Sequence, residues 1–443
     1  MNTMTIAEPP LEPLALTVPQ DELRIAHLLG HRESAVLGGG GSGLQRLLEG
    51  LRSHRVDPIV FRPSLSQDDG LVDPLSRIGC SVRNFHAFLP VAGLSRRRRH
   101  QWLADGSSLM SFDLVGALNR EPDVAAIHTH VLGRLGAIAA FAARQRQVPL
   151  VISLHRGWQG MEGHPTHNHH GHATKGWDWG RLFGWLLHTS RLLDHAEALL
   201  VSDAKEAASL RQMRPNQHVL AQPAGIQVEV YERDCRAQAS AAFPQIKGRD
   251  VLLELSQLDP IRNQAWLVEQ APNLMARHPN ALLILGGANT DLAYTESLRR
   301  RIRAFGLSDA VIFTGGLPPR DPRLIGLLQS ARALLVPAQA NSHSRVILKA
   351  WAACTPVIAS RASGAPDLIR DGKNGWLFDL EDPRTFQRAV DATLFDTSLG
   401  AQLAAEGAKV VRDEYDSTML AGRLRNLYEQ LSHEKRARPR LRR

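Results

Sequence analysis

Short apolar runs rich in β-branched residues alternate with amphipathic stretches along nearly all of this 443-residue chain. This alternation is typical of βαβ units, in which helices join parallel strands. A parallel sheet needs right-handed crossovers and helices on both faces, so the pattern predicts doubly wound, Rossmann-like α/β domains. The strands are expected at 34–37, 58–61, 124–128, 150–154, 198–201, 251–255, 281–285, 310–313, 333–336 and 356–359.

The strand series restarts near residue 250, and a chain of this length allows two or three domains, so we expect two that face a central cleft. The stretch 236–249 is polar and poor in β-branched residues, which favours a linker. The final helical stretch has apolar residues at helical spacing and is expected to return to the first domain. The expected parts are a loose leader at 1–22, a first domain at 23–235, the linker at 236–249, a second domain at 250–397, a helical segment at 398–432 and a basic tail at 433–443.

Composition excludes several classes of protein. Hydrophobic residues make up 43% and charged residues 22% of the chain, which is globular composition. The three cysteines are far apart and lack CxxC spacing, so neither a disulfide framework nor a structural zinc site is indicated. No apolar run is long enough to span a bilayer, and the start lacks the features of a signal peptide. We therefore expect a soluble cytoplasmic protein.

The net charge of +9 is concentrated in two patches, residues 96–99 and residues 435–443. Such patches bind anionic lipid head groups, which leaves open a peripheral contact of the basic tail with the inner membrane surface. The alternative interpretation is a solvated loop and tail. No aromatic residues interleave either patch as base stacking requires, so a nucleic-acid partner is disfavoured.

A glycine-rich turn, GGGGSG at 38–43, lies just before an expected helix. Glycines let the backbone approach a ligand, and the free amides at a helix start favour an anion, so Gly40 and Gly41 are candidate ligand-binding residues. No lysine follows, so this is not the phosphate loop of nucleotide hydrolases. A tight strand-to-helix turn would use glycine as well.

The most specific segment runs from 337 to 379 and ends with WAACTPVIASRASGAPDLIRDGKNGWLFD. It resembles the C-terminal domain of family 4 glycosyltransferases (glycosyl transferases group 1). The resemblance extends back through LSQLDPIRNQ, the Gly286-Gly287 turn and VIFTGGLPPRD, and a weaker likeness covers the first half. It implies the GT-B fold, with two Rossmann-like domains facing a cleft, and transfer of a hexose from a nucleotide sugar to an acceptor with retention.

The donor site that this resemblance implies is altered in four places. Gln257 and Arg262 stand where the family has the arginine and lysine that hold the donor diphosphate. Asn341 and Lys349 stand where it has two glutamates, which contact the donor sugar and the nucleoside ribose. Gln257 is neutral, and Lys349 cannot accept hydrogen bonds from ribose hydroxyls as a carboxylate does.

Several residues offer compensation for these losses. Arg262 keeps a cation with a fork suited to phosphate oxygens, and Arg345 adds another. Ser344 lies in a turn whose amides can face a phosphate. We expect Arg262, Arg345 and Lys349 to converge on one pocket beside the helix at 346–353. Side chains and helix amides would then replace a metal at the leaving diphosphate, and neither a metal nor another cofactor is expected.

Histidines provide the remaining candidates. His155 ends an expected strand where the family often has a histidine facing the cleft, and with Arg262 it is a candidate catalytic residue, expected near the 38–43 turn. Packing in the core is the alternative for His155. The stretch MEGHPTHNHHGHATK at 161–175 is expected to be an acceptor-side loop, because no cysteine or well-placed carboxylate completes a zinc site.

Two classes of function remain open. The first is a glycosyltransferase that uses a nucleotide sugar and an acceptor that the sequence does not identify. The alternative is a catalytically inactive GT-B protein that binds a partner or an anionic ligand. The combined changes at Gln257, Asn341 and Lys349 separate the two, because an enzyme must still bind a donor despite them.

Overall fold

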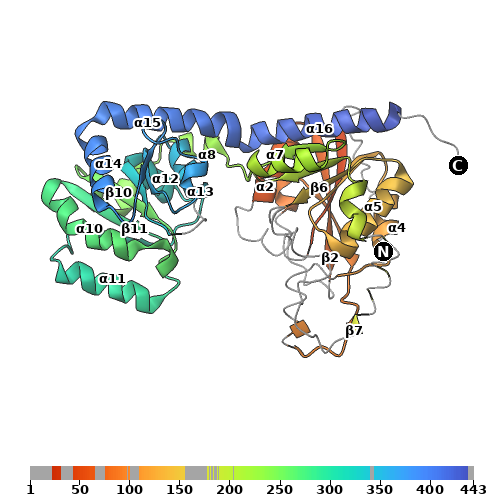
Figure 1. Ribbon diagram of the computed structural model, residues 1–443, viewed down its shortest axis with the longest axis horizontal. Helices are drawn as coiled ribbons and strands as arrows, with labels where there is room; N and C mark the ends of the chain where they lie inside the picture. The colour runs from red at the N-terminus through yellow and green to blue at the C-terminus, as the bar shows by residue number, and fades with distance from the viewer. Residues whose placement is uncertain are drawn as a thin grey trace, which may run out of the picture.

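The computed structural model describes residues 22–30, 43–64, 75–96, 98–99, 109–154, 177–178, 180, 183, 187, 189–202, 204–339 and 344–437. These residues form two α/β domains that lie side by side, with helices α15 and α16 running along both of them (Figure 1). The expected leader at 1–22 lies outside the described residues apart from Glu22, and so do the histidine-rich loop and the last six residues.

The first domain is built on a parallel sheet with strand order β3-β2-β1-β5-β6-β8-β9 in the described part of the chain. Because the order reverses between β1 and β5, the carboxyl ends of these two strands mark the switch point of the sheet. The main strands are β1 (Leu23–Leu28), β2 (Val56–Ser64), β3 (Ser81–His86), β5 (Val124–Thr129), β6 (Leu150–Leu154), β8 (Ala198–Val201) and β9 (His218–Ala221). The other elements are α2 (Gly43–Ser53), η2 (Ser76–Ile78), α4 (Leu114–Arg120), α5 (Gly133–Arg146), η3 (Thr189–His195), α7 (Ala204–Met213) and the short antiparallel pair β4 (Val91–Ala92) and β7 (Trp177–Asp178).

The second domain has a parallel sheet with strand order β12-β11-β10-β13-β14-β15, whose switch point lies between β10 and β13. Its strands are β10 (Asp250–Leu255), β11 (Ala281–Gly286), β12 (Val311–Gly315), β13 (Ala331–Val336), β14 (Val357–Ser360) and β15 (Trp376–Phe378). Its other elements are α8 (Val228–Glu232), α9 (Arg236–Ala242), η4 (Pro244–Ile246), η5 (Pro260–Arg262), α10 (Gln264–Arg277), α11 (Leu292–Ala304), α12 (Pro322–Ser330), α13 (Ser344–Ala352), η6 (Ala365–Asp367), α14 (Pro383–Phe395) and α15 (Thr397–Val410).

Each sheet is covered by apolar side chains on both faces. In the second domain, Leu253 and Ile284 belong to the core on one face, and Leu252 and Leu283 belong to the core on the other. This near-continuous apolar run is what a parallel strand buried on two sides requires. Both sheets match the architecture expected from the alternation of strands and helices.

The chain crosses between the domains twice. It leaves the first domain near Ile226 and returns through the turn η7 (Val411–Tyr415) into α16 (Ser417–Ala437). The two crossing segments are bonded to each other, because the Ile226 amide donates to the Tyr415 carbonyl at 2.9 Å and the Ser417 amide donates to the Ile226 carbonyl at 2.8 Å. Both crossings therefore form one paired junction.

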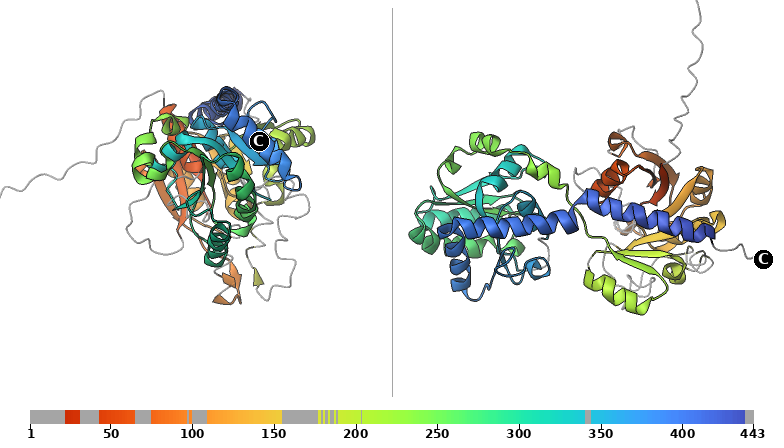
Figure 2. Two further views of the ribbon diagram at one scale, coloured as in Figure 1. Left: turned by 90° about the vertical axis from the view of Figure 1, so that its left-hand side faces the viewer. Right: turned by 90° about the horizontal axis from the view of Figure 1, so that it is seen from above.

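Helix α16 is an integral part of the first domain. Seen from above, α15 and α16 follow one line across the two domains (Figure 2). Leu424 and Tyr428 are buried in the core on one face of the first sheet. A Cβ atom on Gly50 of α2 would lie 2.8 Å from the Ala421 side chain, so this glycine allows the two helices to pack closely. The predicted return of the C-terminal segment to the first domain is confirmed.

Two expected boundaries, those of the linker and of the tail, need correction. The linker expected at 236–249 forms α9 and η4, which pack in the second domain because Ala239 and Ile246 are buried in its core. The strand expected at 34–37 lies outside the described residues, within which β1 is the first strand of the sheet. The tail expected from 433 begins later, because α16 continues to Ala437 and Lys435 forms an ion pair with Glu197.

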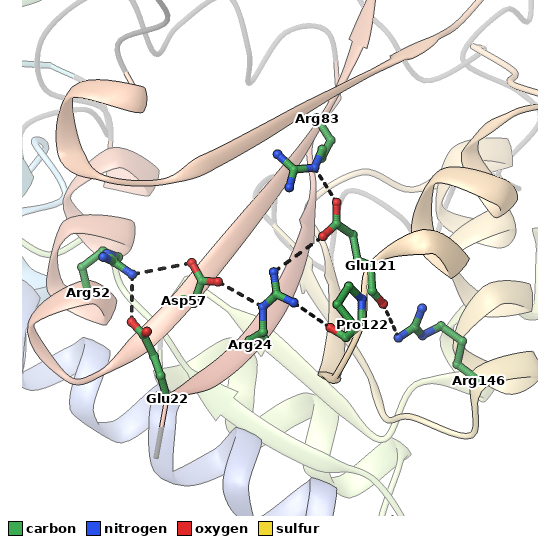
Figure 3. A network of polar contacts seen from close by, with 8 residues as sticks. All are labelled: Glu22, Arg24, Arg52, Asp57, Arg83, Glu121, Pro122 and Arg146. Carbon is green, nitrogen blue, oxygen red and sulfur yellow. Dashed lines mark hydrogen bonds and ion pairs between the residues drawn. The ribbon is translucent and has the colours of Figure 1, made fainter. Parts of the chain in front are cut away.

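A polar network closes the amino-terminal end of the first sheet, opposite the end where ligands bind (Figure 3). Arg24 lies at its centre, because its Nε is 3.1 Å from Asp57 Oδ2 and one of its terminal nitrogens is 3.6 Å from a Glu121 oxygen. All three side chains are at least 87% buried. The other members are Glu22, Arg52, Arg83, Pro122 and Arg146.

Replacing Arg24 with alanine is expected to destabilise the first domain by about 3 kcal/mol, because two largely buried carboxylates lose their shared cation. Chemical denaturation followed by circular dichroism measures this as a lower midpoint of the first transition. The matched control is Arg120→Ala, which removes an exposed arginine of α4. Equal midpoints for the two variants would contradict a stabilising role for the network.

Among the described residues, no helix is both long and apolar enough to cross a membrane.

Candidate active site

A cavity of about 460 Å³ lies between the two domains, at the carboxyl ends of β10, β11 and β12. We call it the cleft cavity. Ligands of doubly wound sheets bind at this edge, near the switch point. Its described lining comprises Arg46, Ile226, Gln227, Val230, Tyr231, Leu255, Ser256, Gln257, Arg262, Gly286, Gly287, Ala288, Thr314, Gly315, Gly316, Leu317, Pro319, Arg320, Leu324, Arg345, Val346 and Lys349.

The cleft cavity is strongly cationic. Arg262, Arg345 and Lys349, the three cations expected to converge, all line it. Two further cations join them, Arg46 from α2 of the first domain and Arg320 from the loop before α12. No aspartate or glutamate occurs among its described lining residues. An anion bound here would relieve the repulsion among these side chains.

Burial and nearby positive charges lower the pKa of Lys349. Removal from water, together with the neighbouring charges of Arg345 and Arg46, lowers the pKa of its ammonium group to about 8. Burial and Arg345 also lower the pKa of Arg46. Charges on α13 and α2 therefore act on each other across the cleft, and a bound phosphate would favour the protonated form of Lys349.

Binding of a sugar nucleotide is accordingly expected to weaken as pH rises through about 8. The ligand binds the protonated lysine, and the protonated fraction falls about tenfold between pH 7 and pH 9. Titration calorimetry across this range measures the effect. Lys349→Arg keeps its charge at both pH values and should flatten the profile, whereas parallel profiles for wild type and variant would contradict the assignment.

The two domains are also linked directly at one side of the cavity. Arg320 donates to Glu49 of α2 at 2.9 Å and to the Gln227 side-chain oxygen at 2.5 Å. The Arg46 guanidinium donates to the Gly225 carbonyl at 2.8 Å. Glu49 thus offsets Arg320 and also acts on Arg46, whereas Arg345 and Lys349 form no ion pair with a carboxylate among the described residues.

The loop after β10 is held by a buried acid. Burial raises the pKa of Glu254 to about 8, although hydrogen bonds from Ser256 and Gln264 lower it. The Ser256 hydroxyl donates to Glu254, and the Gln264 amide donates to the Gln257 carbonyl at 2.9 Å. A Cβ atom on Gly287 would lie 1.6 Å from the Ser256 carbonyl oxygen, so only glycine permits this approach. These contacts place Gln257 on the cavity wall.

Arg262 is positioned by the short helix η5. The Asp259 side chain accepts a hydrogen bond from the Arg262 amide at 3.2 Å, and Asp259 Oδ2 lies 3.7 Å from Arg262 Nε. The following Asn263 has a left-handed backbone with φ of 64° and donates to the Pro337 carbonyl at 3.1 Å. Arg262 therefore faces the cavity from a fixed turn, although Asp259 takes up part of its charge.

Four of the candidate residues lie outside the described residues: Gly40, Gly41, His155 and Asn341. Their roles stay predictions, as does the expected approach of His155 to the 38–43 turn. Ser344 is the first residue of α13, which places its backbone at a helix start. Helix α2 begins at Gly43, directly after the glycine-rich segment.

The fold and the cleft cavity define a GT-B protein of the glycosyltransferase type. Residues 38–225 match the model of the glycosyl transferase 4-like domain, and residues 236–410 match the model of glycosyl transferases group 1. The two matches follow the order of the two domains and together span most of the chain. The chain belongs to this family of glycosyltransferases, as the sequence resemblance implied.

Curated relatives match over part of their length. The D-inositol 3-phosphate glycosyltransferase of Acidothermus cellulolyticus is 28% identical over 225 residues, which covers 49% of each chain. A GDP-mannose-dependent phosphatidylinositol monomannoside mannosyltransferase of Mycolicibacterium smegmatis is 29% identical over 215 residues, or 46% of this chain and 54% of the relative. The chain thus spans about half the length of the curated relatives it matches.

Solved structures resemble the whole architecture. HepE of Anabaena in complex with UDP has a TM-score of 0.63 at 16% identity, covering 92% of this chain and 100% of the other. Sucrose-phosphate synthase of Thermosynechococcus elongatus has a TM-score of 0.60 at 17% identity, covering 93% and 100%. At such identities the likeness concerns the fold, and it confirms the GT-B architecture.

Proposed function

We propose that this protein transfers a hexose from a nucleotide sugar to an acceptor, with retention, in the cleft cavity. The observation that carries the proposal is the set of five cations that face one interdomain cavity, with no carboxylate among its described lining residues. A sugar nucleotide would place its negatively charged diphosphate among these cations. Family membership supports the reaction class, and the Anabaena structures hold UDP and UDP-glucose.

In the proposed reaction, the bond between the sugar C1 and the diphosphate oxygen breaks, and the leaving diphosphate keeps the electron pair. Arg262, Arg345 and Lys349 would stabilise its growing negative charge. The acceptor hydroxyl oxygen forms the new bond to C1 and releases its proton to an oxygen of the leaving diphosphate. Side-chain cations supply the charge stabilisation in this proposal, so it includes no metal in the transfer step.

The altered donor positions shape what the site would bind. Gln257 offers an amide in place of a cation, and Lys349 offers donors in place of a carboxylate. Arg46 and Arg320 supply two additional cations, one from each domain. We therefore expect the diphosphate to dominate affinity and the nucleoside to contribute less than it would beside a carboxylate.

A thermal-shift screen of UDP, GDP, ADP and their sugars tests the proposal, because a ligand that binds only the native state stabilises it by about 2.7 kcal/mol at 100 times its Kd. We expect at least one sugar nucleotide to raise the Tm, and that donor to release nucleoside diphosphate when acceptors are added. Stabilisation without any turnover would favour the inactive, ligand-binding alternative. No shift with any nucleotide would remove both the donor and the enzyme proposal.

A further inference from the structure

Three buried histidines meet at the switch point of the first sheet, and we call them the histidine triad. His27 lies on β1, His128 lies opposite it on β5, and His130 follows β5. They are 0%, 0% and 4% exposed. One nitrogen from each ring lies within 4.8 Å of the others. None of the three is among the described residues that line the cleft cavity.

The spacing of the rings resembles that of ligands around one ion. His27 Nδ1 and His130 Nε2 are 3.2 Å apart. Two nitrogens bound to a tetrahedral zinc lie about 3.3 Å apart, and their ring centroids about 5 Å apart. The ring centroid of His27 lies 5.1 Å from that of His128 and 5.5 Å from that of His130. The His128 and His130 centroids are 4.1 Å apart, so the two rings would have to separate by about 1 Å to bind the same ion.

The protonation of His27 also suits a metal. Within the described residues, His27 Nε2 is buried without a hydrogen-bond partner. Burial lowers the pKa of His27 to about 3, so the ring is neutral at physiological pH, and the neutral imidazole is the form that binds metals. An unpartnered buried nitrogen costs free energy, and an ion bound at Nε2 would recover it, whereas an ion bound at Nδ1, the nitrogen that faces His130, would not.

His128 is oriented from both sides. Its Nδ1 lies 2.6 Å from the Tyr428 hydroxyl of α16, and its Nε2 lies 2.8 Å from the Ser153 hydroxyl of β6. A metal-bound histidine usually donates its other N–H to an oxygen, which fixes the ring. Tyr428 can accept that bond from Nδ1, which leaves Nε2 for an ion once the Ser153 hydroxyl turns away.

From this arrangement we infer that the histidine triad binds one divalent ion that prefers imidazole ligands, such as Zn²⁺. The ion would join β1 to β5 at the switch point, and Tyr428 would couple it to α16. Its role would be to stabilise the first domain, and the inference stands independently of the proposed sugar transfer. Imidazole ligands exclude Mg²⁺ and Ca²⁺, which prefer oxygen.

The test uses the untagged full chain in a background that removes the other dense histidine cluster. In that background, serine replaces His164, His167, His169, His170 and His172. The protein is stripped with EDTA, incubated with ZnCl₂, desalted and analysed for zinc by mass spectrometry. We expect about one zinc per chain and a higher Tm in its presence. Cobalt(II) should give the intense visible absorption of a tetrahedral site.

His27→Gln in the same background is expected to lose zinc and the Tm increase, while retaining the far-ultraviolet circular dichroism of the parent. His218→Gln is the matched control, because His218 is partly exposed and pairs with Glu434 at 3.4 Å. Tyr428→Phe should bind zinc more weakly, by about tenfold or more, because His128 loses its orienting partner. The inference fails if the background protein binds no zinc, or if His27→Gln binds as much as His218→Gln.

Discussion

Replacing Arg345 with glutamate is expected to weaken sugar-nucleotide binding by about 10- to 100-fold, since one charge-assisted contact is worth 1.5–3 kcal/mol. The new carboxylate would face the cavity beside Lys349 and Arg46, whose pKa values Arg345 lowers in the wild type. It would pair with them and repel the diphosphate. Titration calorimetry with the best donor from the thermal-shift screen measures the loss.

Arg388→Glu is the matched control for this variant, because Arg388 is an exposed residue of α14 and does not line the cleft cavity. The change in net charge is the same in both variants, so general electrostatic attraction of the ligand cancels. Equal affinities for the two variants would show that the anion binds elsewhere.

Replacing Leu424 with aspartate is expected to destabilise the first domain by more than about 4 kcal/mol, because it removes a buried side chain and buries a charge without a partner. Leu424 is 1% exposed and packs in the core shared by α16, α2 and the first sheet. Denaturant unfolding followed by circular dichroism measures the loss, together with the soluble fraction after expression. The expected outcome is an early first transition or insoluble protein.

Asn426→Asp is the control on the same helix, since Asn426 is exposed and the substitution adds the same charge. It should leave the midpoint within about 0.5 kcal/mol of wild type. If Leu424→Asp behaved like this control, α16 would be an appendage and would not belong to the folded unit of the first domain.

The alternation of strands and helices was sufficient to predict both domains, because every buried parallel strand must be apolar on two faces. The strands of the second domain, such as β10 and β13, are of this kind. Strands β1 and β3 were missed because polar residues interrupt their apolar pattern. β1 carries Arg24 and His27, and β3 is an edge strand with exposed Arg83 and Asn84.

The misplaced linker has a similar origin. α9 reads as RAQASAA, which lacks an apolar face in sequence. It packs through close backbone approach instead, because a Cβ atom on Gly326 of α12 would lie 2.0 Å from the Cys235 carbonyl oxygen. A glycine that accommodates a helix nearly a hundred residues away gives no signal in either segment alone.

The sequence predicted only part of the cavity wall. Arg262, Arg345 and Lys349 were found by position within a resembling motif, and all three line the cleft cavity. Arg46 and Arg320 were missed because they come from different domains and share no local pattern. Arg46 lies one turn after the start of α2 and is therefore close in sequence to the glycine-rich turn. This closeness was the signal that could have identified it as a site residue.

The most direct test of the central claim, that this altered cavity binds a sugar nucleotide, is to measure nucleotide affinity in wild type and in the double variant Gln257→Arg/Lys349→Glu. The variant restores the charges that the family resemblance implies at these two positions, both of which line the cavity. We expect both proteins to bind a sugar nucleotide, with affinities that differ by about tenfold or more, equivalent to 1.4 kcal/mol. If neither protein binds any UDP, GDP or ADP sugar, the cavity is not a donor site and the glycosyltransferase proposal is wrong.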